Sequence, residues 1–149
     1  MKKTIISLIF FLFSTLLYAQ KQLSKTEQSV QQTVVKLFEA LSNRDSVSLK
    51  NYSTADITLY EYGQIWNVDS LIMKAVTLNQ AADFKRTNTF DFTNTTTDKT
   101  MAWVTYRLQS AITRDGKQST VQWLETVVLA KEKKQWKVKH LHSTLIKRG

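Results

Sequence analysis

The stretch TMAWVTYRLQSAITRDGKQSTVQWLETVVLAKEKKQWKVKHLHSTLI, residues 100–146, decides the fold class. Threonine, valine and aromatic residues dominate it, and these residue types are enriched in β-strands. The pair Asp115–Gly116 divides it and favours the type I′ turn of a hairpin, in which glycine accepts a positive φ. A second turn is expected from Lys131 to Lys134. Together with an earlier extended stretch, the region predicts an antiparallel meander of four strands over residues 84–96, 100–113, 118–130 and 135–146.

The residues before the meander show helical patterns instead. Ser24 and Glu27 have the spacing of a capping box, which satisfies two free amide groups at a helix start. Apolar residues then recur at helical intervals, and we expect this helix to end near Ser42–Asn43. A short second helix is expected over residues 46–52, and Asn67 fits the N-cap of a third.

A strand pair is expected between the second and third helices, with residues 57–62 and 65–66 joined by a turn at Gly63–Gln64. Long strands twist and curl. Helices on the concave side of such a sheet close one end of a cone. We therefore expect one α+β domain, a cone-shaped fold in which a curved antiparallel sheet packs against three N-terminal helices. The space between sheet and helices is where ligand sites are usually found.

Residues 1–19 have the composition of a secretory signal peptide. Lys2 and Lys3 precede an apolar run from Ile5 to Leu17, and Ala19 supplies a small residue before the expected cleavage. The run is shorter than the roughly 20 residues of a membrane-spanning helix, and an uncleaved anchor is the alternative. We expect residues 20–149 to form the mature domain, periplasmic or secreted, without a stable membrane anchor.

Composition excludes several classes of site. The chain has 149 residues and no cysteine, which excludes disulfides, thiolate metal sites and a cysteine nucleophile. The formal net charge is +9, and +7 without Lys2 and Lys3. Much of the excess lies at lysines within residues 131–139, which we interpret as a solvated face rather than a nucleic-acid site. Attraction to anionic membrane or polymer surfaces stays open.

Several pairs in the last third of the chain occur together in a known family. They are Arg107–Leu108, Asp115–Gly116, Glu125–Thr126, Trp136 and His140–Ser143. This set resembles the SnoaL-like family of the nuclear transport factor 2-like superfamily, and it is similar to the association domain of calcium/calmodulin-dependent kinase II. The resemblance implies a homodimer or larger ring formed through the outer sheet face. It also implies that Arg107 points into the pocket. Val127 and Ser143 stand where that domain has two further arginines, which implies a less basic pocket.

Glu125 is the first candidate site residue. Alternation along its strand puts Glu125 on the same apolar, inward face as Trp123. A buried carboxylate needs a partner, and we expect Arg107 on the neighbouring strand to hold it in a two-pronged ion pair. A purely structural ion pair, a ligand-binding role and acid/base catalysis by Glu125 are three interpretations that stay open.

Two histidines and several aromatic residues complete the candidates. Simple alternation puts His140 and His142 on the face of Trp136 and Val138, although which face is inward near His142 stays open. His142 is a second acid/base candidate, with a core or interface histidine as the alternative. No further ligand is evident, so we expect no metal and no cofactor. The aromatics are either core residues or pocket walls. The expected ligand-binding set is Arg107, Glu125, Trp123, His142, Tyr60 and Trp103.

The sequence thus predicts an exported SnoaL-like domain that binds a small molecule in its cone or acts as an oligomerising module. One alternative is an isomerase, dehydratase or cyclase that uses Glu125 or His142 as its base, with electrostatic support from Arg107. Another is a protein-interaction domain of the cell envelope that uses the hairpin around Lys133 and Lys134.

Overall fold

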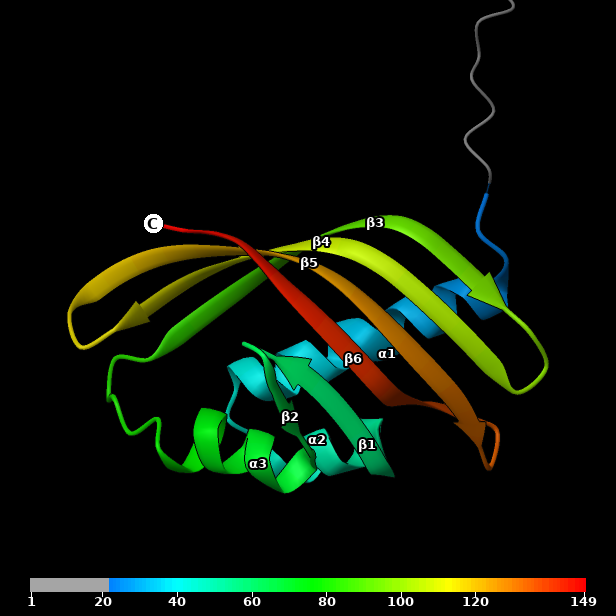
Figure 1. Cartoon of the computed structure of the whole chain (residues 1–149), viewed down its shortest axis with the longest axis horizontal. Helices are drawn as coiled ribbons and strands as arrows, with labels where there is room; N and C mark the ends of the chain where they lie inside the picture. The colour runs from blue at the N-terminus through cyan, green and yellow to red at the C-terminus, as the bar shows by residue number, and fades with distance from the viewer. Residues whose placement is uncertain (1–21) are drawn as a thin grey trace, which may run out of the picture.

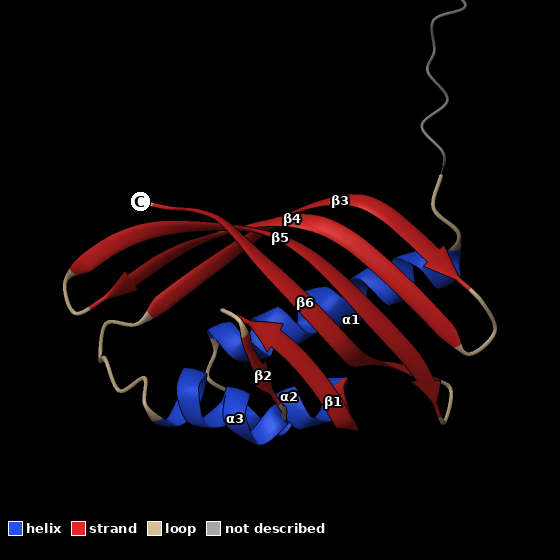
Figure 2. Cartoon of the chain, in the orientation of Figure 1, coloured by secondary structure: helices blue, strands red, loops and turns tan. Residues whose placement is uncertain are grey.

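The computed structural model describes residues 22–149, so the predicted signal peptide lies outside the described residues. Three helices and a π-helical turn lie on one face of a curved, open sheet of six strands (Figures 1 and 2). This confirms the predicted α+β class. Within residues 22–149, no helix has both the length and the apolar character needed to cross a membrane. In chain order the elements are α1 (Lys25–Ser42), α2 (Ser46–Tyr52), β1 (Ser53–Glu61), β2 (Gln64–Trp66), α3 (Val68–Ile72), η1 (Met73–Thr77), β3 (Lys85–Thr97), β4 (Met101–Arg114), β5 (Lys117–Glu132) and β6 (Gln135–Arg148).

Side-chain caps define where the helices begin. Ser24 accepts a hydrogen bond from the amide of Glu27, and the Glu27 carboxylate accepts one from the amide of Ser24 at 2.7 Å, so the predicted capping box is present. Asp45 caps α2, and Asn67 caps α3 as predicted. The apolar stripe of α1 is buried against the sheet, because its residues recur with the period of the helix.

The sheet has the strand order β2-β1-β6-β5-β4-β3. Strands β3 to β6 form the antiparallel meander that the sequence predicts. The sheet becomes mixed where β1 lies parallel to β6, with Leu59 opposite Leu141. The sequence pattern did not include this pairing, because turn signals relate only strands that follow one another in the chain.

A β-bulge in β6 determines which of its side chains face the helices. Val128 pairs with His140, whereas Leu129 pairs with Val138, so Lys139 is the extra residue. A bulge shifts the alternation of the strand by one. Val138 is buried on the inner face before the bulge, and Leu141 takes the inner face after it. Simple alternation for His140 and His142 is therefore wrong, because the bulge turns both to the outer face.

The core lies between the inner sheet face and α1. Strands β4 and β5 contribute alternate, fully buried residues such as Val104 and Val127. A cluster of aromatic rings joins helix to sheet, with ring centroids of Phe38 and Tyr106 6.3 Å apart and those of Phe90 and Tyr106 5.4 Å apart. This packing fills the middle of the cone, so open space is found only nearer its end.

Candidate functional site

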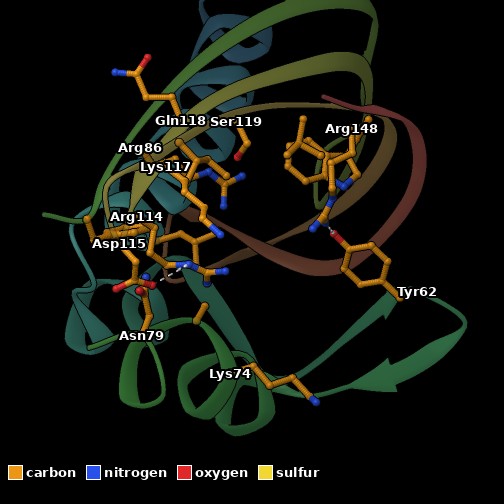
Figure 3. Close-up of a pocket in the computed structure, with 16 residues that line it drawn as sticks. Tyr62, Lys74, Asn79, Arg86, Arg114, Asp115, Lys117, Gln118, Ser119 and Arg148 are labelled. Atoms are coloured by element: carbon orange, nitrogen blue, oxygen red, sulfur yellow. Dashed lines mark hydrogen bonds and ion pairs between the residues drawn. The ribbon is translucent and has the colours of Figure 1, made fainter. Parts of the chain in front are cut away.

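A cavity of about 570 Å³ opens at the end of the cone where the β4–β5 hairpin and the C-terminal part of β6 meet the segment after α3 (Figure 3). Its volume lies within the roughly 300–1,000 Å³ usual for small-molecule sites. The lining residues are Leu41, Tyr62, Lys74, Ala75, Asn79, Phe84, Arg86, Ile112, Arg114, Asp115, Lys117, Gln118, Ser119, Val121, Trp123 and Arg148.

The wall of the cavity is strongly basic. Five lining side chains carry a positive charge and one, Asp115, a negative charge; the five are Lys74, Arg86, Arg114, Lys117 and Arg148. They come from η1 and from four strands. Figure 3 shows four of them around one hollow, whereas Lys74 extends away from the others, with its Nζ 5.0 Å from the centroid of the Trp66 ring. Val127 and Ser143, which implied a less basic pocket, are absent from this wall, and its charges come from other positions, mostly strand ends.

Arg86 on β3 is held by neutral groups. Its Nε donates to Asn88 Oδ1 at 2.9 Å and to Ser110 Oγ at 3.1 Å. Its guanidinium lies over the rings of Trp123 and Phe38, at 5.4 and 5.5 Å from their centroids. None of the ion pairs between described side chains includes it. Arg86 is therefore oriented by packing and hydrogen bonds, and its charge is available to a bound anion.

Glu125 lies deeper in the cone, with only 2% of its surface exposed. It stands opposite Tyr106 on β4 and Ser143 on β6, and the Ser143 hydroxyl donates to Glu125 Oε1. Within the described chain, Glu125 Oε2 and the Tyr106 hydroxyl have no hydrogen-bond partner. Burial raises the pKa of Glu125 from 4.5 to about 7. The hydroxyl of Ser143 and the Arg86 charge oppose that rise, and Glu61 adds to it.

Glu61 is the second carboxyl in the interior. It ends β1 on the inner side, and burial raises its pKa while Ser143, Arg86 and His142 lower it. Burial lowers the pKa of Arg86, and the charges of Glu125 and Glu61 raise it. Two carboxyl groups thus share one serine and one guanidinium. Glu61 also lines a void of about 30 Å³, room for only one or two water molecules.

The family model described as SnoaL-like domain matches residues 30–146. The chain belongs to the SnoaL-like domain family. Its fold is the one expected from the resemblance, and solved structures of low sequence identity share it. No curated protein sequence matches the chain.

Three solved structures illustrate the range of proteins with this fold. A ketosteroid isomerase-like protein from Erwinia carotovora atroseptica has 14% identity and a TM-score of 0.68, over 84% of this chain and 99% of that one. An NTF2-like protein from Cytophaga hutchinsonii has 14% identity and a TM-score of 0.69, over 83% and 100%. The hub domain of the calcium/calmodulin-dependent kinase II of S. rosetta has 20% identity and a TM-score of 0.70, over 84% and 100%.

The SnoaL-like domain divides the predicted ligand-binding residues between two faces. Glu125 and Trp123 are buried on the inner face, as predicted, and Trp123 lines the cavity. Arg107 is exposed on the outer face, where it pairs with Leu124, while its buried neighbour Tyr106 pairs with Glu125. The predicted ion pair between Arg107 and Glu125 is wrong, because adjacent residues on a strand point to opposite faces.

The other three predicted residues also lie on the outer face. Trp103 is 46% exposed on β4. Tyr60 on β1 contacts the rings of His140 and His142 edge to face, with centroids 4.8 and 5.8 Å away. His140 Nδ1 is 2.8 Å from the Thr58 hydroxyl. Among residues 22–149, no three His, Asp or Glu side chains come together in a way that could hold a metal ion.

Sequence reasoning missed Arg86 and Glu61, although alternation carried a signal for both. Arg86 lies two and four residues along the same strand face from Asn88 and Phe90, and Phe90 packs against the core. Glu61 follows Leu59 on the inner face of β1 in the same way. Both were overlooked because charged residues near strand ends are usually solvent-exposed.

Proposed function

We propose that this SnoaL-like domain binds a small organic anion in its cone cavity. The observation that supports this is the wall itself, whose lining residues include five cationic side chains and a single carboxylate, that of Asp115. Like charges gathered around one hollow repel one another, and a bound anion would relieve that repulsion. Arg86 gives the site a fixed donor, because its orientation does not depend on a carboxylate partner.

The apolar part of the cavity wall suggests the chemical nature of the uncharged part of the ligand. Phe84, Trp123, Ile112 and Val121 line the same cavity as the basic groups. Arginine binds carboxylate and sulfonate groups through paired N–H donors, and aromatic walls favour flat apolar bodies. The ligand class that fits is therefore an acid with an apolar or aromatic body, rather than a bare inorganic ion.

Isothermal titration with naphthalene-2-sulfonate tests this proposal, because the probe combines an aromatic body with a permanent negative charge. We expect Arg86→Gln to weaken binding at least about tenfold, as loss of a charged hydrogen-bond donor does. Arg107→Gln is the matched control, since Arg107 is exposed on the outer face. Equal loss in both variants, or no binding by the wild-type domain, would contradict the proposal.

A second pair of variants guards against damage to the fold. Lys117 and Arg114 line the cavity from the exposed β4–β5 hairpin, so neutralising them leaves the core intact. We expect the double change Lys117→Gln, Arg114→Gln to weaken the sulfonate without lowering the melting temperature. The changes Lys133→Gln and Lys134→Gln, at the other hairpin, should leave binding unchanged.

Catalysis is the second candidate function, and Glu125 is the observation that favours it. A carboxyl with a pKa of about 7 is suited to exchange protons at neutral pH. Glu125 is absent from the cavity wall, so catalysis would need the Arg86–Trp123 stack to open. His142 lies on the outer face and is not proposed as a base. Isomerisation of a 3-oxo-Δ5-steroid, followed by absorbance, tests this candidate; turnover by the wild type but not by Glu125→Gln would support it.

We further propose that the domain is exported and forms a homodimer. Lys2, Lys3 and the apolar run to Leu17 support export. Exposed apolar side chains on the outer face, Trp103 and Leu124 among them, support a partner there. The lysine hairpin offers less support as a protein-binding site, because Lys137 and Lys139 already pair with Glu132 and Asp56. N-terminal sequencing of the protein from a periplasmic or secreted fraction tests export.

A further inference from the structure

We propose that the cavity binds its anion together with a proton, which is taken up by the carboxyl pair Glu61 and Glu125 behind Arg86. This inference rests on the proposed function, since it describes how that same site responds to pH. It needs no new ligand and no movement of the backbone. It follows from the place of one guanidinium between an open basic cavity and two acids, Glu125 buried and Glu61 half-buried.

Arg86 borders both compartments. It belongs to the cavity wall, and Trp123, over which it lies, belongs to the same wall. The charges of Glu125 and Glu61 act on Arg86, and its charge acts on both of them. Ser143 lies between the two acids in the sheet, because it stands opposite Glu125 on β5 and its neighbour His142 stands opposite Tyr60, the residue before Glu61 on β1. A change of charge on the cavity side of Arg86 therefore changes the free energy of ionising both carboxyl groups.

The interior has one guanidinium and two carboxyl groups, and this balance of charge favours one proton on the carboxyl pair. Two carboxylates close to each other in an apolar interior disfavour being ionised together. Arg86 is the only cation named among the groups that act on Glu125 in the described chain. An anion bound to Arg86 offsets part of the positive charge that stabilises the ionised form of Glu125. The acid pair then holds its proton more tightly.

The groups that face Glu125 come from every strand around it. They are Tyr106 on β4, Ser143 on β6, Glu61 on β1 and Arg86 on β3. Ser143, Arg86 and His142 act on Glu61, with the His142 side chain on the outer face of the sheet. Helix α1 contributes the uncharged ring of Phe38 beneath the guanidinium. His142 is the one histidine in this set.

The sign of the effect follows from linkage. If a bound anion promotes proton uptake, then a proton already in place promotes anion binding by the same factor. Glu125 exchanges its proton at about pH 7 in the empty site, because burial raises its pKa to that value. Affinity for the anion is therefore expected to rise as the pH falls through about 7.

The experiment is titration of the whole described domain with naphthalene-2-sulfonate from about pH 5.5 to about pH 8.5, a range in which the probe keeps its charge. We expect the dissociation constant to be smaller at the acid end by a factor on the order of ten. Glu125→Gln should bind as tightly at the alkaline end as the wild type does at the acid end, with a flat profile. Glu132→Gln, an exposed acid in the lysine hairpin, is the matched control and should keep the wild-type profile.

Two further measurements separate the possible outcomes. Titration in Bis-Tris and in Tris, whose ionisation enthalpies differ, reports directly whether wild-type protein takes up a proton, even if Glu125→Gln fails to fold. His142→Gln should keep the pH dependence. A profile lost in His142→Gln but kept in Glu125→Gln would overturn the inference, as would binding without proton uptake. Absence of binding at every pH would instead overturn the proposed function itself.

Discussion

At the scale of single residues, the interior of the cone contains a carboxyl group that forms no ion pair within the described chain. Glu125 accepts one hydrogen bond, from Ser143, and its second oxygen has no hydrogen-bond partner in the described chain. Arg107, the cation that the sequence offered as its partner, is on the other face of the sheet. Burial therefore favours the protonated acid over the carboxylate, and the stability of the domain depends on that proton.

The free energy of unfolding should consequently fall as the pH rises through neutrality. The folded-state pKa of Glu125, about 7, lies above the ordinary 4.5, so its contribution is complete below about pH 4.5 and is lost as the pH passes 7. The loss is up to about 3 kcal/mol. Glu61 acts in the same direction. Urea unfolding at about pH 5 and about pH 8 should show a smaller difference for Glu125→Gln than for wild type. Equal differences in both would contradict this prediction.

The two hydroxyls beside Glu125 should behave differently when removed. Ser143→Ala deletes the one donor to a buried carboxyl and should lower the free energy of unfolding by about 1–3 kcal/mol. Tyr106→Phe removes a buried hydroxyl that lacks a hydrogen-bond partner in the described chain, so its cost should stay below about 1 kcal/mol. Chemical denaturation of both variants at one acid pH makes the comparison. A larger cost for Tyr106→Phe would show that its hydroxyl has a partner in solution.

At the scale of elements, the two hairpins of the meander have the same turn and different residues. Asp115 and Gly116 have φ of 52° and 72°, and Lys133 and Lys134 have φ of 47° and 72°. The first pair suits a type I′ turn, because glycine carries no Cβ. The second imposes a left-handed backbone on two side chains that disfavour it.

Replacing Lys134 by glycine should therefore stabilise the domain. The substitution puts at φ 72° the residue that occupies the equivalent place at Gly116. We expect the free energy of unfolding to rise by about 0.5–1 kcal/mol. Lys131→Gly, in the adjoining strand, is the control and should destabilise. Thermal unfolding of the two variants measures the difference, and a lower melting temperature for Lys134→Gly would contradict it.

Element by element, local signals predicted most of the fold. Three local signals each predicted an element boundary that the structure has: Ser24 with Glu27, Asn67, and Asp115–Gly116. The candidate site was harder to predict, because it depends on which face a residue takes. Arg107 was placed inward from a resemblance, whereas alternation beside buried Tyr106 places it outward. The bulge at Lys139 turns His142 outward, and no local sequence signal marked that bulge.

At the scale of the whole molecule, the sheet has two faces with different characters. The inner face is filled by the core and ends in the basic cavity. The outer face exposes apolar side chains, with Trp103 46% and Leu124 47% accessible. Exposed apolar groups gathered on one face mark association sites. The outer face is thus the surface that a second copy would cover.

Trp103→Glu should convert a dimeric domain to a monomer. A charge at the centre of an apolar interface must lose its water without gaining a partner. Val47→Glu, on helix α2 away from the sheet, is the matched control, because Val47 is itself 74% exposed. Sedimentation velocity measures the mass of each. A wild-type domain that is monomeric at all concentrations, or a dimer unaffected by Trp103→Glu, would contradict this prediction.

The parallel pairing of β1 with β6 has a consequence for the order in which the chain acquires its structure. Leu59 reaches its partner Leu141 only after the intervening helix, π-helical turn and four strands have been synthesised. Contacts between such distant segments form late, because closing a long loop costs entropy before any contact forms. A growing chain that still lacks β6 leaves β1 and one edge of β5 without the strand that lies between them. Such a chain cannot complete the six-stranded sheet, so the final strand is the one that joins the β1–β2 pair to the meander.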